Sequence, residues 1–198
     1  MRSLCARVTP LALAVGLTFA LTTPPHAQAP SWLDKPALGW NVSAAQIPRA
    51  PNSTEAGAAI LKRCQMDDRR GTAGERAIAA AGWTPFLVFD RELVNGDLEI
   101  IGGLAGADGM CRPMGFNVFV FVGGRYAGTL SPAPMDSRTD GTVGAVRILD
   151  PNTISGEFSR YTDKDALCCP SSRVSVTYRI DRTPRGPTVT ATATREIR

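Results

Sequence analysis

The chain has 198 residues, of which 43% are hydrophobic, so it is long enough and apolar enough to fold around one core. Its 22 basic and 18 acidic residues give a net charge of +4, which is too balanced for the basic surface of a nucleic-acid-binding protein. Only one long apolar run is present, which excludes a polytopic membrane protein. Disordered chains combine lower hydrophobicity with higher net charge, so that class is excluded too.

Residues 1–29 have the pattern of a secretory signal peptide. Two arginines precede an apolar stretch over residues 11–21, and Ala27-Gln28-Ala29 matches the A-x-A pattern of a cleavage site. The stretch is shorter than the roughly 20 residues that a spanning helix needs. Cys5 lies before this stretch, whereas a lipid-bearing cysteine would follow it directly. We therefore expect a periplasmic or secreted protein with no membrane span after cleavage.

Cleavage after the signal peptide changes the chemistry open to the protein. It removes Cys5, His26 and two arginines but no acidic residue, which leaves a net charge of +2, four cysteines and no histidine. Without histidine there is no Ser-His-Asp triad, no Cys-His pair and no histidine-bound metal. We therefore predict that the protein is not an enzyme and has no cofactor and no metal site.

The mature chain divides into an arm and one domain. Residues 30–52 are rich in proline and read as an irregular N-terminal arm, and residues 53–198 as a single globular domain. The hydrophobic arm residues expected to dock on the domain are Trp32, Leu33, Leu38 and Trp40. Ser53 or Thr54 is expected to cap a helix that runs through about Met66. A second short helix is predicted over residues 74–81, ended by Gly82.

From residue 84 onward the pattern changes to that of strands. The Asn95-Gly96 dipeptide is typical of a hairpin turn, and the glycine-rich residues 102–109 predict a flexible connection or a bulge. Residues 116–122 are apolar on both faces, which favours a central, covered strand. The predicted strands are 84–89, 97–101, 116–122, 125–130, 143–149, 153–161, 173–180 and 188–194.

The last two predicted strands have different patterns. In residues 173–180 the side chains of Val174, Val176, Tyr178 and Ile180 are expected to face inward. Residues 188–194 alternate threonine with small apolar residues, as a half-exposed edge strand does. The order of short N-terminal helices followed by hairpin-connected strands predicts an α+β fold with a largely antiparallel β-sheet.

A strand–turn–strand segment and a closing strand carry a family resemblance. The first reads FVFVGGRYAGTLSP over residues 119–132, with Pro134 after it, and the second reads VSVTYR over residues 174–179. Over roughly residues 84–180, the domain resembles the LppP/LprE lipoprotein family. The resemblance implies an envelope or secreted protein of unassigned biochemistry, and it transfers no catalytic residue. The chain differs from this family in lacking the lipid-bearing cysteine.

The four mature cysteines predict disulfide bonds, because they are even in number in an exported chain. We expect two bridges that join Cys64 and Cys111 to Cys168 and Cys169, in either pairing. A bridge between the adjacent Cys168 and Cys169 is disfavoured, because neighbouring side chains on an extended chain point apart. The alternative is a thiol or Cu(I)-binding protein, since sulfur also gathers in residues 110–114 and soft sulfur ligands favour Cu(I).

Acidic residues support two weaker hypotheses. A histidine-free hydrolase could use a carboxylate pair of the glycosidase type, drawn from Asp97, Glu99, Asp108, Asp136 and Asp140. Residues 136–141 also resemble the start of a calcium loop, but Arg138 occupies the third ligand position. We therefore interpret this segment as a solvated turn in which Arg138 pairs with a neighbouring aspartate.

The sequence thus favours an exported, disulfide-stabilised, non-catalytic envelope or periplasmic protein. The candidate binding surface is formed by the loops around residues 102–112 and 131–141. Its expected partner is an unknown envelope partner or a small ligand, and not a nucleic acid. The competing functions are the carboxylate-based hydrolase and the thiol or Cu(I)-binding protein.

Overall fold

The computed structural model describes residues 31–34 and 39–197. The predicted signal peptide and Leu38 therefore lie outside the described residues. The helices are α1 (Gly57–Arg63) and α2 (Ala73–Ala80), with 3₁₀ turns η1 (Trp32–Asp34) and η2 (Val88–Asp90). The strands are β1 (Thr84–Phe86), β2 (Leu93–Asn95), β3 (Leu98–Leu104), β4 (Gly106–Ala107), β5 (Pro113–Met114), β6 (Asn117–Val122), β7 (Arg125–Thr129), β8 (Val143–Asp150), β9 (Thr153–Arg160), β10 (Ser172–Thr183) and β11 (Gly186–Ile197).

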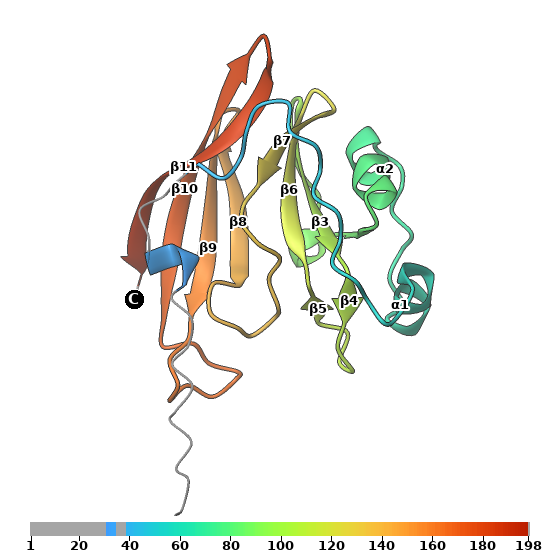
Figure 1. The fold of residues 1–198 in the computed structure, drawn as a ribbon. Helices are drawn as coiled ribbons and strands as arrows, with labels where there is room; N and C mark the ends of the chain where they lie inside the picture. The colour runs from blue at the N-terminus through green and yellow to red at the C-terminus, as the bar shows by residue number, and fades with distance from the viewer. Residues whose placement is uncertain (1–30, 35–38, 198) are drawn as a thin grey trace, which may run out of the picture.

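Two antiparallel sheets pack face to face (Figure 1). The first sheet has the order β1-β3-β6-β7, with β2 also paired to β3, and the second has the order β11-β10-β9-β8. A small third sheet joins β4 to β5. Both helices precede the strands, and α2 covers the outer face of the first sheet (Figure 1). This arrangement confirms an α+β fold with largely antiparallel pairing.

The central strand β6 is buried along its whole length, as its sequence predicts. Val118 and Val120 face the core between the two sheets. Phe119 and Phe121 point the other way and pack with Ile78 of α2. Because a strand alternates its side chains between two faces, a strand covered on both faces is apolar at successive positions, here from Val118 to Val122.

The glycine-rich segment differs from the prediction. Gly102 and Gly103 do not belong to a flexible connection but lie inside β3, where both are buried. A Cβ atom at Gly102 would come within 2.6 Å of the Phe86 ring, and one at Gly103 within 2.8 Å of the Phe119 ring. These glycines therefore give two aromatic rings access to the strand backbone.

The second sheet follows its predicted alternation. The four side chains of β10 that were expected to face inward are buried, namely Val174, Val176, Tyr178 and Ile180. The strand β11 lies at the edge of this sheet, also as predicted. The hydroxyl group of Tyr178 donates a hydrogen bond of 2.5 Å to the carbonyl oxygen of Leu130, which follows β7. This contact joins the two sheets through their shared core.

The N-terminal arm docks on the sandwich. Leu33 is buried, and Trp32 and Trp40 pack against the core between the sheets. The Asn41 side chain donates hydrogen bonds to the carbonyl oxygens of Thr129 and Val189, at 2.9 and 3.0 Å. The side chain thereby links β7 of the first sheet to β11 of the second.

The first helix is shorter than predicted. It begins at Gly57 with Ala56 at the N-cap, and no side chain caps it. Ser53 accepts a hydrogen bond from the amide of Glu55 instead, which forms a local turn before the helix. The second helix is capped by a reciprocal pair, Thr72 and Glu75, and Gly82 follows it with a φ of +93°, as predicted.

The first predicted strand also ends early. It stops at Phe86, and the chain then turns through η2, in which Phe89 has a left-handed φ of 59°.

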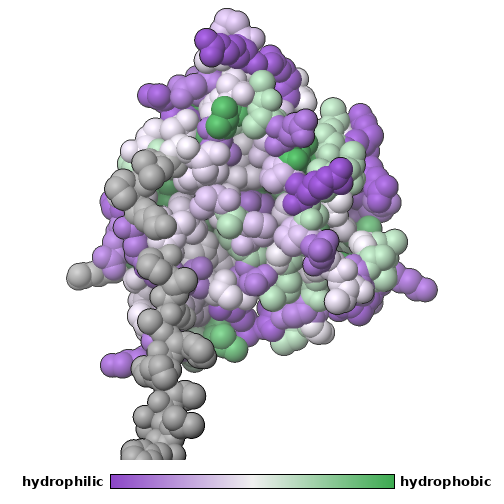
Figure 2. Space-filling model, in the orientation of Figure 1, coloured by the Kyte–Doolittle hydropathy of each residue, from purple (hydrophilic) through white to green (hydrophobic). Residues whose placement is uncertain are grey.

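On the visible face of the molecule, hydrophobic residues form small separate patches, and hydrophilic residues gather at the tip formed by β10 and β11 (Figure 2). Within the described residues, no helix is both long and apolar enough to cross a membrane.

Candidate functional site

A cleft of about 680 Å³ lies where the two sheets meet the segment that follows α1. Its walls come from residues 64–69, 86–89, 111–116 and 137–144, and from the end of β9. Ligand sites typically have volumes of about 300–1,000 Å³. The cleft is therefore large enough for a small organic molecule.

The cleft has a buried apolar lining, which we call its floor, and several polar side chains. Phe86, Val88, Phe116 and Val143 are buried and line the cleft, and Met66 is half-buried beside them. The polar and charged side chains of the lining are Gln65, Asp67, Arg69, Ser137, Arg138, Thr142, Ser159 and Tyr161. An apolar surface with a few polar groups is typical of sites that bind small molecules.

The cleft concentrates an uncommon backbone conformation. Five described residues other than glycine have a left-handed φ, and four of them line the cleft. These four are Gln65, Phe89, Cys111 and Arg138, with φ values between 52° and 64°. Such residues carry a steric cost, and they cluster at active sites and ligand-binding sites. Their concentration marks this cleft as the candidate functional site.

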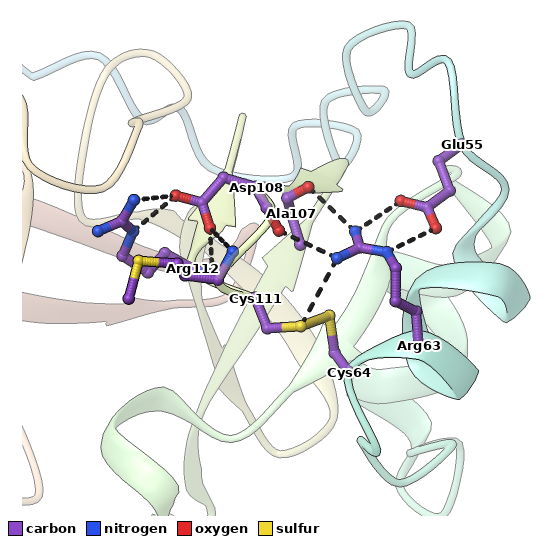
Figure 3. The surroundings of a disulfide bond; sticks show 8 residues. Glu55, Arg63, Cys64, Ala107, Asp108, Cys111 and Arg112 are labelled. Carbon is purple, nitrogen blue, oxygen red and sulfur yellow. Dashed lines mark hydrogen bonds and ion pairs between the residues drawn. A yellow bond between two sulfur atoms is a disulfide. The ribbon is translucent and has the colours of Figure 1, made fainter.

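A disulfide bond and one arginine fix one wall of the cleft. Cys64, at the end of α1, is bonded to Cys111, with the two Cα atoms 5.5 Å apart. Arg63 donates two hydrogen bonds to the carboxylate of Glu55, at 3.1 and 2.7 Å. The same guanidinium group donates to the carbonyl oxygens of Ala107 and Asp108 (Figure 3). Arg63 thus ties α1 to the turn that carries Cys111.

That turn is organised by the carboxylate of Asp108. The amides of Met110 and Arg112 donate to it at 2.8 and 3.0 Å, and the Arg112 side chain donates at 2.6 Å. These hydrogen bonds hold the pKa of Asp108 below its ordinary value, and the bond donated by the Arg112 amide has the largest effect. The carboxylate therefore stabilises the turn in which Cys111 takes its left-handed conformation.

The structure brings together parts of the two loops that the sequence singled out. The amide of Gly115 donates to Asp136 at 2.6 Å, and both the amide and the hydroxyl of Ser137 donate to the carbonyl oxygen of Pro113. Cys111 from one loop and Ser137 and Arg138 from the other line the cleft. The sequence did not reveal the other walls at residues 64–69 and 86–89, because their proximity depends on the tertiary fold.

The predicted disulfide pairing is wrong. Cys64 pairs with Cys111, and Cys168 pairs with Cys169, so no bridge joins the two groups. The contacts of Arg63 hold Cys64 beside Cys111, whereas Cys168 and Cys169 lie together in the loop between β9 and β10. Cys168 lies in a turn in which the Cys169 amide donates to Ala166, so the chain is not extended there. The steric argument against an adjacent bridge therefore does not apply.

The five candidate carboxylates do not converge on the cleft, since none of them is among its lining residues. Arg182 donates two hydrogen bonds to Asp97 and lowers its pKa. Arg160 pairs with Asp140 at 3.0 Å, and Asp108 and Asp136 accept the hydrogen bonds described above. These four aspartates therefore stabilise turns and join segments.

The expected ion pair of Arg138 is also absent. Asp136 accepts a hydrogen bond from the Gly115 amide and Asp140 pairs with Arg160, so Arg138 has no carboxylate partner in the described part of the chain. Arg138 is instead exposed at the cleft.

Across residues 31–34 and 39–197, no three His, Cys, Asp or Glu side chains are placed to hold a metal ion.

The fold and the cleft define a disulfide-containing α+β sandwich with a pocket at one end. Residues 95–183 match the model of the LppP/LprE lipoprotein family, which confirms the resemblance on that segment. The matched segment contains β3 to β10, and with them the cleft walls at residues 111–116 and 137–144. Comparisons with curated proteins and with solved structures found no significant match.

Proposed function

We propose that the protein is an exported, non-catalytic envelope or periplasmic protein that binds a small ligand in the cleft. The concentration of four left-handed residues around one apolar cavity is the observation that carries this proposal. The match of residues 95–183 to a lipoprotein family supports a role in the cell envelope. The signal-peptide pattern of residues 1–29 supports export.

The chemistry of the lining indicates the kind of ligand. Arg69 pairs with Glu75 at 2.8 Å and with Glu92 at 3.1 Å, so its charge is compensated. Arg138 has no such partner among the described residues, and it lines the same cleft as Phe116 and Val143 of the floor. A molecule with an apolar body and one anionic group would bury its body on this floor and accept a charge-assisted hydrogen bond from Arg138.

A binding role is favoured over the hydrolase. Glycoside hydrolysis needs two carboxyl groups on either side of the scissile bond. Asp67 is the one acidic residue among the lining residues of the cleft, and the five candidates lie elsewhere. The Cu(I)-binding alternative needs thiolates, but the four described cysteines are paired in disulfide bonds.

A fluorescence titration tests the proposal with anilinonaphthalene sulfonate, a probe that has an apolar body and one anionic group. We expect the folded protein to bind the probe and Arg138→Gln to weaken binding about tenfold, because a charge-assisted hydrogen bond contributes about 1.5–3 kcal/mol. Arg173→Gln is the matched control, since Arg173 is exposed on β10 and does not line the cleft. Equal affinity in both variants would contradict the proposed role of Arg138.

A further inference from the structure

The second disulfide bond differs from the first in what it connects. Cys168 and Cys169 are neighbours in sequence, with Cα atoms 3.8 Å apart, and both are exposed. They lie in the loop of residues 161–171 between β9 and β10. Cys64 and Cys111, in contrast, are 47 residues apart and join two separate segments.

The fold does not depend on the bond between adjacent cysteines. A disulfide bond stabilises a protein mainly by restricting its unfolded chain, and the effect grows with the length of the loop that it closes. The bond between Cys168 and Cys169 closes no chain loop beyond its own peptide unit. Its removal is therefore expected to leave the free energy of unfolding nearly unchanged, unlike removal of the Cys64–Cys111 bond.

Other contacts hold the loop in place without the disulfide bond. The carboxylate of Asp165 accepts hydrogen bonds from the amides of Thr162 and Ser171, at 2.8 and 3.0 Å, and from the Ser171 hydroxyl. The Tyr161 hydroxyl donates to the carbonyl oxygen of Leu167 at 3.2 Å. Because neither contact involves sulfur, the loop can keep its anchors when the bond between the cysteines is broken.

Access to the sulfur atoms also differs between the two bonds. Cys168 and Cys169 are exposed, whereas Cys64 and Cys111 are each half-buried. The Arg63 guanidinium group lies 3.6 Å from the sulfur of Cys111 and covers that bond from one side (Figure 3). Thiol–disulfide exchange requires a thiolate to reach a sulfur atom, so an external reductant meets the Cys168–Cys169 bond first.

We propose that Cys168–Cys169 is a site of reversible thiol–disulfide exchange with external dithiols. A thiolate of the dithiol attacks one of the two sulfur atoms, the Cys168–Cys169 bond breaks, and the other cysteine leaves as a thiolate. The second thiol of the reductant then attacks the mixed disulfide and releases the first cysteine. Two electrons pass from the dithiol to the protein, which gains two thiols while the reductant becomes a disulfide. Neither cysteine lines the cleft, so this proposal does not rest on the ligand proposed there.

Differential alkylation of the full protein tests this proposal. The folded protein is treated with increasing concentrations of dithiothreitol, quenched with iodoacetamide and analysed by peptide mass spectrometry. We expect Cys168 and Cys169 to be alkylated at a reductant concentration at least about tenfold below that needed for Cys64 and Cys111. Removal of the dithiothreitol and treatment with oxidised glutathione before alkylation should remove the label from Cys168 and Cys169.

Two double variants separate reactivity from stability. Cys168→Ser/Cys169→Ser should keep the Tm of the wild-type protein, whereas Cys64→Ser/Cys111→Ser should lower it. The proposal is overturned if Cys64 and Cys111 are labelled first or together with the adjacent pair. It is equally overturned if Cys168 and Cys169 are labelled without reductant, or if they are found bridging two chains.

Discussion

Gly102 and Gly103 show how single residues shape the core of the first sheet. Their positions are adjacent in β3, so a side chain at each would point to opposite faces of the sheet. The Phe86 ring fills one of these spaces and the Phe119 ring fills the other. Glycine is thus required here for close approach of a ring to the backbone and not for flexibility.

Gly102→Ala should lower the free energy of unfolding by about 1–3 kcal/mol, because the new methyl group overpacks against the ring of Phe86. Gly106→Ala is the matched control, since a Cβ atom there meets no atom closer than 3.7 Å. The control should change the stability by no more than about 0.5 kcal/mol. Urea denaturation measures both values, and equal stability of the two variants would contradict this account of β3.

A positive φ at a single residue could be predicted from the sequence only where that residue is glycine. Gly82 follows α2 with a positive φ, as the helix pattern predicts. Phe89 and Cys111 also have a positive φ, but nothing in their side chains favours it. The surrounding tertiary contacts impose these conformations, and for that reason the sequence did not reveal the most distinctive feature of the cleft.

At the scale of elements, the loop of residues 161–171 is organised by one carboxylate. Hydrogen bonds from the Ser171 hydroxyl and from the amides of Thr162 and Ser171 lower the pKa of Asp165 from 3.8 to about 2. A lowered pKa in the folded state means that the ionised carboxylate stabilises the fold. This contribution is present in full above pH 3.8 and is lost as the pH falls through about 2.

A pH titration followed by NMR tests the role of Asp165. The amide shifts of Thr162 and Ser171 should change with a midpoint near pH 2, because protonation of Asp165 weakens the bonds that these amides donate. Asp165→Asn should abolish this transition. A midpoint at the ordinary value of 3.8 would show that the hydrogen bonds to Asp165 do not form in solution.

Elements with one strong local pattern were predicted well, and elements that depend on distant contacts were not. The alternation of β10 and the continuous apolar run of β6 identify these strands, because burial on one face or on both leaves a direct trace in the sequence. The start of α1 was predicted too early, because Ser53 forms a local turn with Glu55 and does not cap the helix. Side chains such as serine suit both roles.

At the scale of the whole molecule, a few polar side chains hold the two sheets in register with each other. Tyr178 of β10 reaches across the core to Leu130, and Asn41 of the arm bonds to both β7 and β11. Tyr178 is fully buried, and burial raises the pKa of its hydroxyl group well above the ordinary value. The neutral hydroxyl is therefore available as a donor across the physiological pH range.

Tyr178→Phe should lower the free energy of unfolding by about 1–3 kcal/mol, because the buried carbonyl of Leu130 loses its donor. Tyr161→Phe removes the same hydroxyl group from a contact with the exposed Leu167 and should cost no more than about 0.5 kcal/mol. Denaturant unfolding of the two variants gives both values. An equally small loss in both would contradict a structural role for the bond between the sheets.

The pairing of the cysteines and the position of the cleft are properties of the whole molecule that the sequence did not determine. Four cysteines permit three pairings, and the choice depends on the contacts of Arg63, which bring Cys64 and Cys111 together. The cleft likewise combines segments that are far apart in the sequence, such as residues 64–69 and 137–144. Cys111, Ser137 and Arg138, from the two loops that the sequence singled out, are among its lining residues.

A variant that fills the cleft can test whether a small molecule with an apolar body binds there. Gly144 lines the cleft, and a Cβ atom there would make only ordinary contacts, at 3.8 and 3.9 Å. Gly144→Phe should therefore fold normally but occupy part of the cavity, whereas a Cβ atom at Gly39 meets no atom of the described residues within 4 Å, so Gly39→Phe is the control.

The decisive measurement is the affinity of each variant for anilinonaphthalene sulfonate, with the Tm as a check on folding. We predict that Gly144→Phe binds the probe at least about tenfold more weakly than the wild-type protein, because the ring excludes it from the apolar floor. Gly39→Phe should bind it unchanged. Wild-type affinity in a folded Gly144→Phe variant would contradict the assignment of this cleft as the binding site.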